Sequence, residues 1–184
     1  MAGQLHEFDP PDRFVAGTVG QPGERAFFLQ ATSGQRTISV SLEKVQVAAL
    51  AEKLEELLDE VRRRQGNEST VPPVAPPELE DVEPLGAPVE EEFRVGTLAL
   101  AWDDDSDSVL IEAQSMEGEE GSETEPGTEF TGDLLRVRLS PGAARAFAKR
   151  ALRVVAAGRP PCPLCGNPLD PAGHVCPRQN GHRG

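Results

Sequence analysis

Residues 36–61 read RTISVSLEKVQVAALAEKLEELLDEV, and this stretch decides the fold because the spacing of its apolar residues changes partway along. From Arg36 to Leu42 apolar and polar residues alternate, which is the period of a strand with one buried face. After that the apolar residues recur every three or four positions, as in a helix packed on one side. These residues are Val47, Leu50, Ala51, Leu54, Leu57, Leu58 and Val61. The stretch predicts a strand that leads into an amphipathic helix.

Two further strands are expected before this one. Residues 14–19 are mostly apolar and β-branched, and the Gly20-Gln21-Pro22-Gly23 turn leads into a returning strand over residues 25–31. The three strands together predict an antiparallel meander. Ser41 is expected to cap the following helix, and Arg62–Arg64 fill its last turn, where the helix dipole favours cations.

The same order of elements is expected a second time. Phe93-Arg94-Val95-Gly96-Thr97 matches Phe14-Val15-Ala16-Gly17-Thr18 as F-x-x-G-T. Strands are predicted over 93–102, 109–114 and 134–139, and Ser140-Pro141 has the residues of a helix start. We therefore predict an α+β protein of two βββα pseudo-repeats, related by a pseudo-twofold axis, whose antiparallel sheets are covered by two helices.

The expected domain boundaries follow from composition. One duplicated domain covers residues 1–158 and a zinc-knuckle tail covers 159–184; within the domain, repeat one spans 8–66 and repeat two spans 92–158. An acidic, Pro-rich linker at 67–91 joins the repeats and is expected to be a mobile spacer, because such a composition buries little apolar surface. The acidic loop at 115–129 is expected to behave in the same way.

The composition narrows the class of protein. The 184 residues are 38% hydrophobic, which suffices for a core, but only 4% aromatic, so Val, Leu and Ala must fill most of it. No apolar run approaches the ~18 residues of a membrane span. The first ten residues lack the basic start and apolar stretch of a signal peptide. A cytoplasmic protein that makes no contact with membrane is expected.

The net charge of −13 is unevenly distributed along the chain. Residues 66–129 hold nineteen Asp or Glu and a single Arg, whereas residues 130–184 hold nine Lys or Arg and two Asp. On the last helix Arg145, Lys149 and Arg153 recur every four residues and form one stripe. This stripe can face the acidic middle of the chain or an acidic partner.

The strongest chemical pattern lies near the end of the chain. A Cys162-Pro163-Leu164-Cys165-Gly166 turn can present two thiolates to one tetrahedral Zn²⁺, and Cys176, the third and last cysteine, can supply another. A redox role is disfavoured, because prolines surround Cys162 and no helix pattern follows it. We predict a structural zinc site.

Two histidines are candidates for the fourth ligand. His174 is two residues before Cys176, so their side chains lie on the same side of an extended segment. His182 lies near the end of the sequence and is flanked by Gly181 and Arg183. The predicted ligand set is Cys162, Cys165, His174 and Cys176, with His182 as the alternative to His174.

Three segments together resemble an actinobacterial family catalogued only as a domain of unknown function. They are FDPPDRFVAGTVGQPGER at 8–25, FRVGTLALAW at 93–102 and the CPLCGNPLDPAGHVCPRQNG block at 162–181. The resemblance covers nearly the whole chain and implies a soluble actinobacterial protein, with no implied activity. In the family pattern position 174 is His, whereas the residue after Asn-Gly, here His182, is often Tyr. The resemblance therefore favours His174 as the ligand.

The expected function is that of a non-enzymatic, zinc-containing binding or adaptor protein with a protein partner. No catalytic or cofactor-binding residues are predicted, since no nucleophile, paired-carboxylate or dinucleotide pattern is present. One alternative is a nucleic-acid-binding module that uses the basic C-terminal third. It is disfavoured because the acidic middle segment repels phosphate. A second alternative is an enzyme with its site between the two sheets.

Overall fold

The structure is a computed structural model that describes residues 3–21, 24–116 and 132–157. Within these ranges the chain forms seven strands and two α-helices. The strands are β1 (Leu5–Phe8), β2 (Arg13–Val19), β3 (Ala26–Ser33), β4 (Arg36–Leu42), β5 (Glu91–Asp103), β6 (Ser108–Ser115) and β7 (Leu134–Leu139). The helices are α1 (Lys44–Gln65) and α2 (Pro141–Ala156). Two short 3-10 helices, η1 (Gly66–Glu68) and η2 (Pro77–Leu79), lie between α1 and β5 in the sequence. Most of the expected acidic loop at 115–129 lies outside the described residues.

A single mixed sheet holds all seven strands, in the order β1-β7-β6-β5-β4-β3-β2. Neighbours are antiparallel, except that β1 with β7 and β4 with β5 are parallel. The predicted α+β class and the two helices are confirmed, but the strands form one mixed sheet and not purely antiparallel ones. The second half continues the order of the first, because β5-β6-β7 follow β2-β3-β4 in the same sense. The pseudo-twofold relation stays a prediction.

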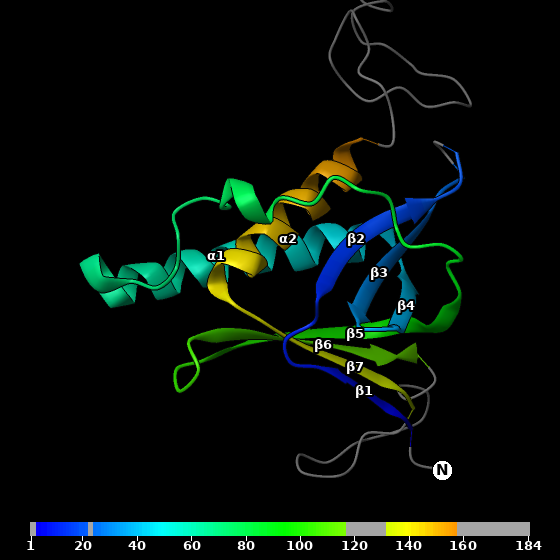
Figure 1. The fold of residues 1–184 in the computed structure, drawn as a ribbon, viewed down its shortest axis with the longest axis horizontal. Helices are drawn as coiled ribbons and strands as arrows, with labels where there is room; N and C mark the ends of the chain where they lie inside the picture. The colour runs from blue at the N-terminus through cyan, green and yellow to red at the C-terminus, as the bar shows by residue number, and fades with distance from the viewer. Residues whose placement is uncertain (1–2, 22–23, 117–131, 158–184) are drawn as a thin grey trace, which may run out of the picture.

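The long strand β5 joins the two halves of the sheet. Its first residues pair with β4, in the register Val40 with Phe93 and Ser41 with Arg94. From Val95 to Asp103 it pairs with β6 instead. The sheet bends where the pairing of β5 changes. In Figure 1, β2, β3 and β4 lie at a steep angle to β5, β6 and β7. One thirteen-residue strand thus belongs to both halves, which makes one bent sheet of what the sequence pattern presents as two.

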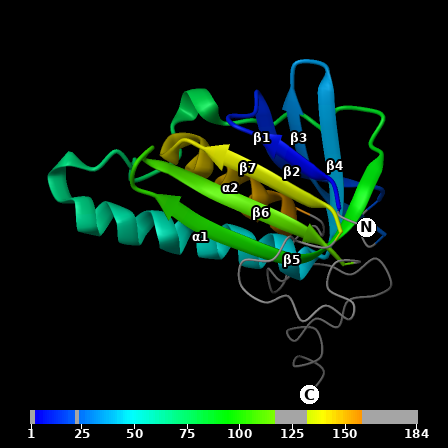
Figure 2. The same ribbon diagram turned by 90° about the horizontal axis from the view of Figure 1, so that it is seen from below.

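Both helices pack on one side of this sheet and against each other (Figures 1 and 2). α2 also contacts β2, at the far edge of the sheet from its own strand β7, and the rings of Phe14 and Phe147 stack there at 4.6 Å. The stripe predicted for α1 is buried, as expected: Val47, Leu50, Ala51, Leu54, Leu58 and Val61 are all in the core. Neither helix within the described ranges combines the length and hydropathy that a membrane span requires.

The helix starts agree in part with the sequence. Ser140 caps α2 as predicted, since its Oγ accepts a hydrogen bond from the Ala143 N–H at 3.2 Å. The cap of α1 is Glu43 and not Ser41. Ser41 Oγ instead donates to the Glu91 carboxylate, a bond between β4 and the start of β5.

The strand β1 was not expected from the sequence. Its four residues, Leu5–Phe8, are too few and too polar to give an alternation that stands out. The structure nevertheless alternates their burial, with His6 and Phe8 inside and the other two exposed. Pairing with β7, whose residues are far along the chain, supplies the hydrogen bonds that make this segment a strand.

The linker at 67–91 is packed on the protein, so the prediction of a mobile spacer is wrong. Val71 is buried in the core. The side chain of Gln30 donates to the Gly86 carbonyl at 3.0 Å and accepts from the Gly86 N–H at 2.8 Å. A Cβ on Gly17 would lie 2.5 Å from the Leu85 side chain, so the absence of a side chain on Gly17 leaves room for Leu85. A Pro-rich segment can therefore be fixed by a few side chains although it forms no long element.

Candidate functional site

The predicted zinc ligands Cys162, Cys165, His174 and Cys176, and the alternative His182, all lie outside the described residues. The zinc site therefore stays a prediction. The described part of the chain offers four other features: the basic side chains of α2, a small charged cavity, an open strand edge beside a groove, and a cluster of His6 with two acids.

The basic stripe of α2 is engaged within the protein. Arg145 is only 2% exposed, and its guanidinium bonds to Asp59 on α1 at 2.6 Å, to the Glu55 carboxylate and to the Pro72 carbonyl at 3.0 Å. Lys149 forms an ion pair with Glu80 of the linker. The expectation that the stripe faces the acidic middle of the chain is confirmed for Lys149, whereas the acidic partners of Arg145 come from α1.

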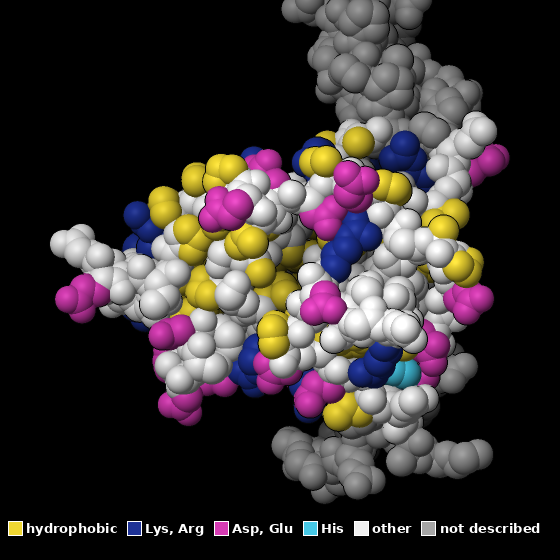
Figure 3. Space-filling model, in the orientation of Figure 1, with side chains coloured by type: hydrophobic (Ala, Val, Ile, Leu, Met, Phe, Trp, Pro, Cys, Tyr) yellow, Lys and Arg dark blue, Asp and Glu magenta, His cyan; other side chains and the backbone are white. Residues whose placement is uncertain are grey.

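A cavity of about 150 Å³ lies between α2, β2 and the linker. Arg150 is buried on its wall and donates from Nε to the Ala16 carbonyl at 2.8 Å and from Nη1 to Asp81 Oδ1 at 3.1 Å. Burial lowers the pKa of the Arg150 guanidinium. Arg13 approaches the same carboxylate, and its hydrogen bond is the main cause that lowers the pKa of Asp81. Figure 3 shows this face, with hydrophobic side chains gathered over α2 and charged side chains beside them.

A concave site with perturbed pKa values is the mark that an enzyme would show. Here, however, the charges satisfy one another: the Asp81 carboxylate accepts from both Arg13 and Arg150. The exposed Asp12, which also lines the cavity, accepts from the Gly34 N–H at 2.7 Å. The arrangement of Arg13, Asp81 and Arg150 explains how the linker is fixed.

The second half of β5 has an open edge. Its pairing with β4 ends at Arg94, and beyond that residue no strand within the described ranges lies on the side away from β6. The backbone N–H and C=O groups that point to this side therefore have no ladder partner there. At the start of the open edge the Gln46 amide, from the first turn of α1, donates to the carbonyls of Val95 and Gly96, each at 3.3 Å.

A groove of about 490 Å³ runs beside this edge, between α1 and β5, which lie close together in Figure 2. Its lining is mostly apolar, and Lys53 is the only charged residue in it: Gln46, Ala49, Leu50, Lys53, Gly96, Thr97, Leu98 and Leu100. Leu98 and Leu100 are only partly buried, because α1 does not cover them fully. An apolar groove and an open strand edge thus lie next to each other.

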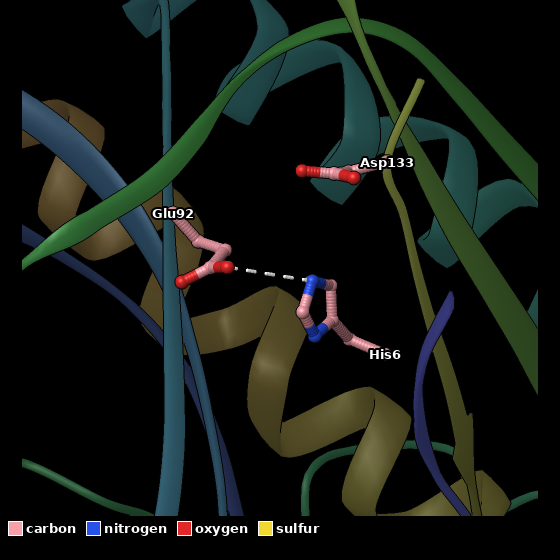
Figure 4. Close-up of side chains that lie close together, drawn as sticks. All are labelled: His6, Glu92 and Asp133. Atoms are coloured by element: carbon pink, nitrogen blue, oxygen red, sulfur yellow. Dashed lines mark ion pairs between the residues drawn. The ribbon is translucent and has the colours of Figure 1, made fainter. Parts of the chain in front are cut away.

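A cluster of three possible metal-ligating groups lies where β1, β5 and β7 begin (Figure 4). His6 comes from β1, Glu92 from the start of β5, and Asp133 directly precedes β7. One ligand atom from each lies within 4.8 Å of the others, and His6 Nε2 is 3.7 Å from Glu92 Oε1.

Sequence reasoning did not find this cluster. The three residues are far apart in the chain and have no local spacing, and β1 itself was not expected. Only the strand pairing of β1 with β7, which places His6 beside Leu135, brings them together. A weak sequence signal existed in the alternation of Leu5, His6, Glu7 and Phe8, which places His6 and Phe8 on one face.

The fold and these features define a protein with one bent mixed sheet that carries two helices on one side and is held by buried arginines. The chain belongs to a family of proteins of unknown function (DUF3090), whose model matches residues 6–176. The matched span includes the predicted ligands Cys162, Cys165, His174 and Cys176, and it ends before His182. No curated protein and no solved structure matches the chain.

Proposed function

We propose that this chain is a non-enzymatic, zinc-containing binding protein that holds an extended segment of a partner protein along the open edge of β5. The observation that carries the proposal is the unpaired edge from Gly96 to Asp103 beside the apolar groove. An extended peptide can add a strand to such an edge, where main-chain hydrogen bonds give affinity and side-chain pockets give specificity.

The groove supplies the pockets that strand addition needs. Successive residues of a bound strand point to opposite faces, so every second side chain of the peptide can enter the groove. There it meets Leu98 and Leu100 of β5 and Ala49 and Leu50 of α1. We expect a partner segment with apolar residues at alternate positions. An acidic residue beside them can pair with Lys53, whose side chain is 73% exposed.

The charges of α2 support a protein partner over a nucleic acid. Arg145, Lys149 and Arg150 are paired within the chain, so they are not available for phosphate contacts without breaking those pairs. The proposal keeps the zinc site of Cys162, Cys165, His174 and Cys176 as a structural clip. It also keeps the cytoplasmic location, the actinobacterial origin and the origin of the two βββα halves by duplication.

Selection from a displayed library of random peptides tests the proposal. Selected peptides should share apolar residues two positions apart, and their binding should slow amide hydrogen exchange in residues 96–103. Ala49→Trp should abolish binding, because Ala49 is exposed and lines the groove. Glu52→Trp is the matched control, since Glu52 is an exposed position of the same helix outside the groove.

Three results would contradict the proposal. Peptide binding that Ala49→Trp leaves unchanged would show that the groove is not the site. A dimer that Ala49→Trp dissociates, seen by sedimentation, would assign the edge to a second copy of the chain. Micromolar binding of mixed-sequence oligonucleotides that weakens with salt would favour the nucleic-acid module instead.

A further inference from the structure

The geometry points to a second metal site, in which His6, Glu92 and Asp133 bind one divalent cation of the first transition series. This site is independent of the proposed Cys/His zinc site and of the proposed peptide groove. It is formed by β1, the residue before β7, and the start of β5, where β5 still pairs with β4.

The unsatisfied nitrogen of His6 is the observation that points to a ligand. The residue is 3% exposed, and its Nε2 has no hydrogen-bond partner among the described residues. The Glu92 oxygen lies 3.7 Å away, which is too long for a hydrogen bond. Leaving a buried polar atom without a partner is energetically costly, so such atoms are rare in folded proteins. A cation between the three side chains would supply the missing partner.

The two carboxylates also lack counter-charges. Among the described residues neither Glu92 nor Asp133 has a Lys or Arg within ion-pair distance, although most acids of the sheet do. With a neutral imidazole the cluster carries a charge of −2, which one divalent cation neutralises. Figure 4 shows the His6 ring and the two carboxylates at the corners of a triangle, with the Nε2 of His6 directed toward Glu92.

The surroundings hold two of the three groups in place. Asp133 accepts from the Gln4 N–H at 2.9 Å, and its own N–H donates to Ser115 Oγ at 3.0 Å. The His6 ring stacks on Phe93 with 25° between the planes. Such supporting contacts orient metal ligands and raise affinity. The Glu92 side chain, in contrast, is 41% exposed and can move.

The size of the cluster suits a small cation after a small movement. Ligands at about 2.0–2.2 Å from a tetrahedral Zn²⁺ lie about 3.4 Å from one another. The observed atoms lie within 4.8 Å of one another, so movements of about 1 Å among the three side chains bring them to this spacing. A nitrogen with two carboxylates favours Zn²⁺, Co²⁺ or Mn²⁺ over Mg²⁺ and Ca²⁺, which prefer oxygen ligands throughout.

The experiment compares metal content across variants of the full chain. Wild type, Asp133→Asn, Glu92→Gln and the control Glu90→Gln are saturated with Zn²⁺, freed of excess metal and analysed by elemental mass spectrometry. Glu90 is exposed, and no ion pair within the described residues involves it. We expect wild type and Glu90→Gln to carry one more zinc per chain than Asp133→Asn and Glu92→Gln. This difference is independent of how much zinc the cysteines bind.

A cobalt spectrum separates this site from the cysteine site. The thiolate-to-cobalt charge-transfer band reports only cysteine ligation, so it should be equal in all four proteins. Wild type should also show a shift of the His6 imidazole resonance on zinc addition, which Glu92→Gln reduces.

Equal zinc content in the four proteins would overturn the proposal, and so would tighter binding of Mg²⁺ than of Zn²⁺. If Asp133→Asn does not fold, Glu92→Gln decides alone, because the Glu92 side chain is 41% exposed and its substitution disturbs less packing.

Discussion

Arg13 and Asp81 are 68 residues apart in sequence and form two hydrogen bonds, from Nε to Oδ2 at 2.6 Å and from Nη2 to Oδ1 at 3.1 Å. The same carboxylate accepts from Arg150 of α2. One acid thus connects β2, the linker and α2. Because the charged form of Asp81 makes these bonds, its pKa lies below the usual 3.8, chiefly through the hydrogen bond from Arg13.

Asp81→Asn should lower the melting temperature at neutral pH, and the loss should depend on pH. A carboxyl with a lowered pKa stabilises the fold above its unfolded value of 3.8 and stops doing so as the pH falls through the lowered value. The melting temperatures of variant and wild type should therefore converge below pH 3.8. Asp105→Asn, on the exposed hairpin, is the control. A difference that stays constant from neutral pH to acid would refute the role of the charge.

Gly17→Ala should destabilise the fold by about 1–3 kcal/mol, the usual cost of overpacking. The new methyl group would lie 2.5 Å from Leu85, so the linker must move. Leu85→Ala alone should also destabilise the fold, but adding it to Gly17→Ala should cost little, because it removes the clash. Urea unfolding of the two single variants and the double variant measures this coupling. Strict additivity would show that the two residues do not meet.

Removing the charges of the two acids that pair with Arg145 should destabilise the fold more than removing the charge of Arg145 itself. Glu55→Gln with Asp59→Asn leaves a guanidinium that is 2% exposed with neutral acceptors and no counter-charge beside it. We expect a loss of about 3 kcal/mol or more. Arg145→Met should cost less, because it keeps the packing and leaves acids that water can reach. Urea unfolding with Glu56→Gln as control tests the order; a larger loss in Arg145→Met would reverse it.

His174→Ala should weaken metal binding at the cysteine site far more than His182→Ala. His174 shares one side of an extended segment with Cys176, whereas His182 lies next to a glycine near the end of the sequence. The thiolate-to-cobalt band at one equivalent of Co²⁺ is the readout, because it does not register the His6 cluster. Equal weakening by both substitutions would remove the distinction between the two histidines.

The spacing of apolar residues along the sequence was enough to predict six of the seven described strands and both helices. The alternation of RTISVSL and the apolar stripe from Val47 to Val61 depend only on which side of an element is buried, and the structure buries that side. The pairing of the strands could not be obtained in this way. Nothing local to residues 91–103 indicates that β4 pairs with its beginning and β6 with its remainder.

The same distinction between local patterns and long-range contacts applies to the candidate sites. The predicted zinc ligands Cys162, Cys165, His174 and Cys176 lie within fifteen residues, so their spacing is a local pattern that the sequence alone can reveal. The cluster of His6, Glu92 and Asp133 and the groove beside β5 exist only after distant segments meet. The prediction of a mobile linker is wrong for a related reason. Its composition does not show that Arg13, Gln30 and Arg150 hold it through specific hydrogen bonds.

The pairing of β1 with β7 has a consequence for synthesis on the ribosome. The Leu134 N–H donates to the Gln4 carbonyl at 2.9 Å, so β1 must wait for about 130 residues before its partner strand leaves the exit tunnel. The carbonyl of Ala16 waits as long for Arg150. Contacts of such sequence separation slow folding and leave early segments exposed to wrong partners. Nascent chains stalled before β7 should therefore depend on a holding chaperone, and release of that dependence should coincide with the emergence of residues 134–156.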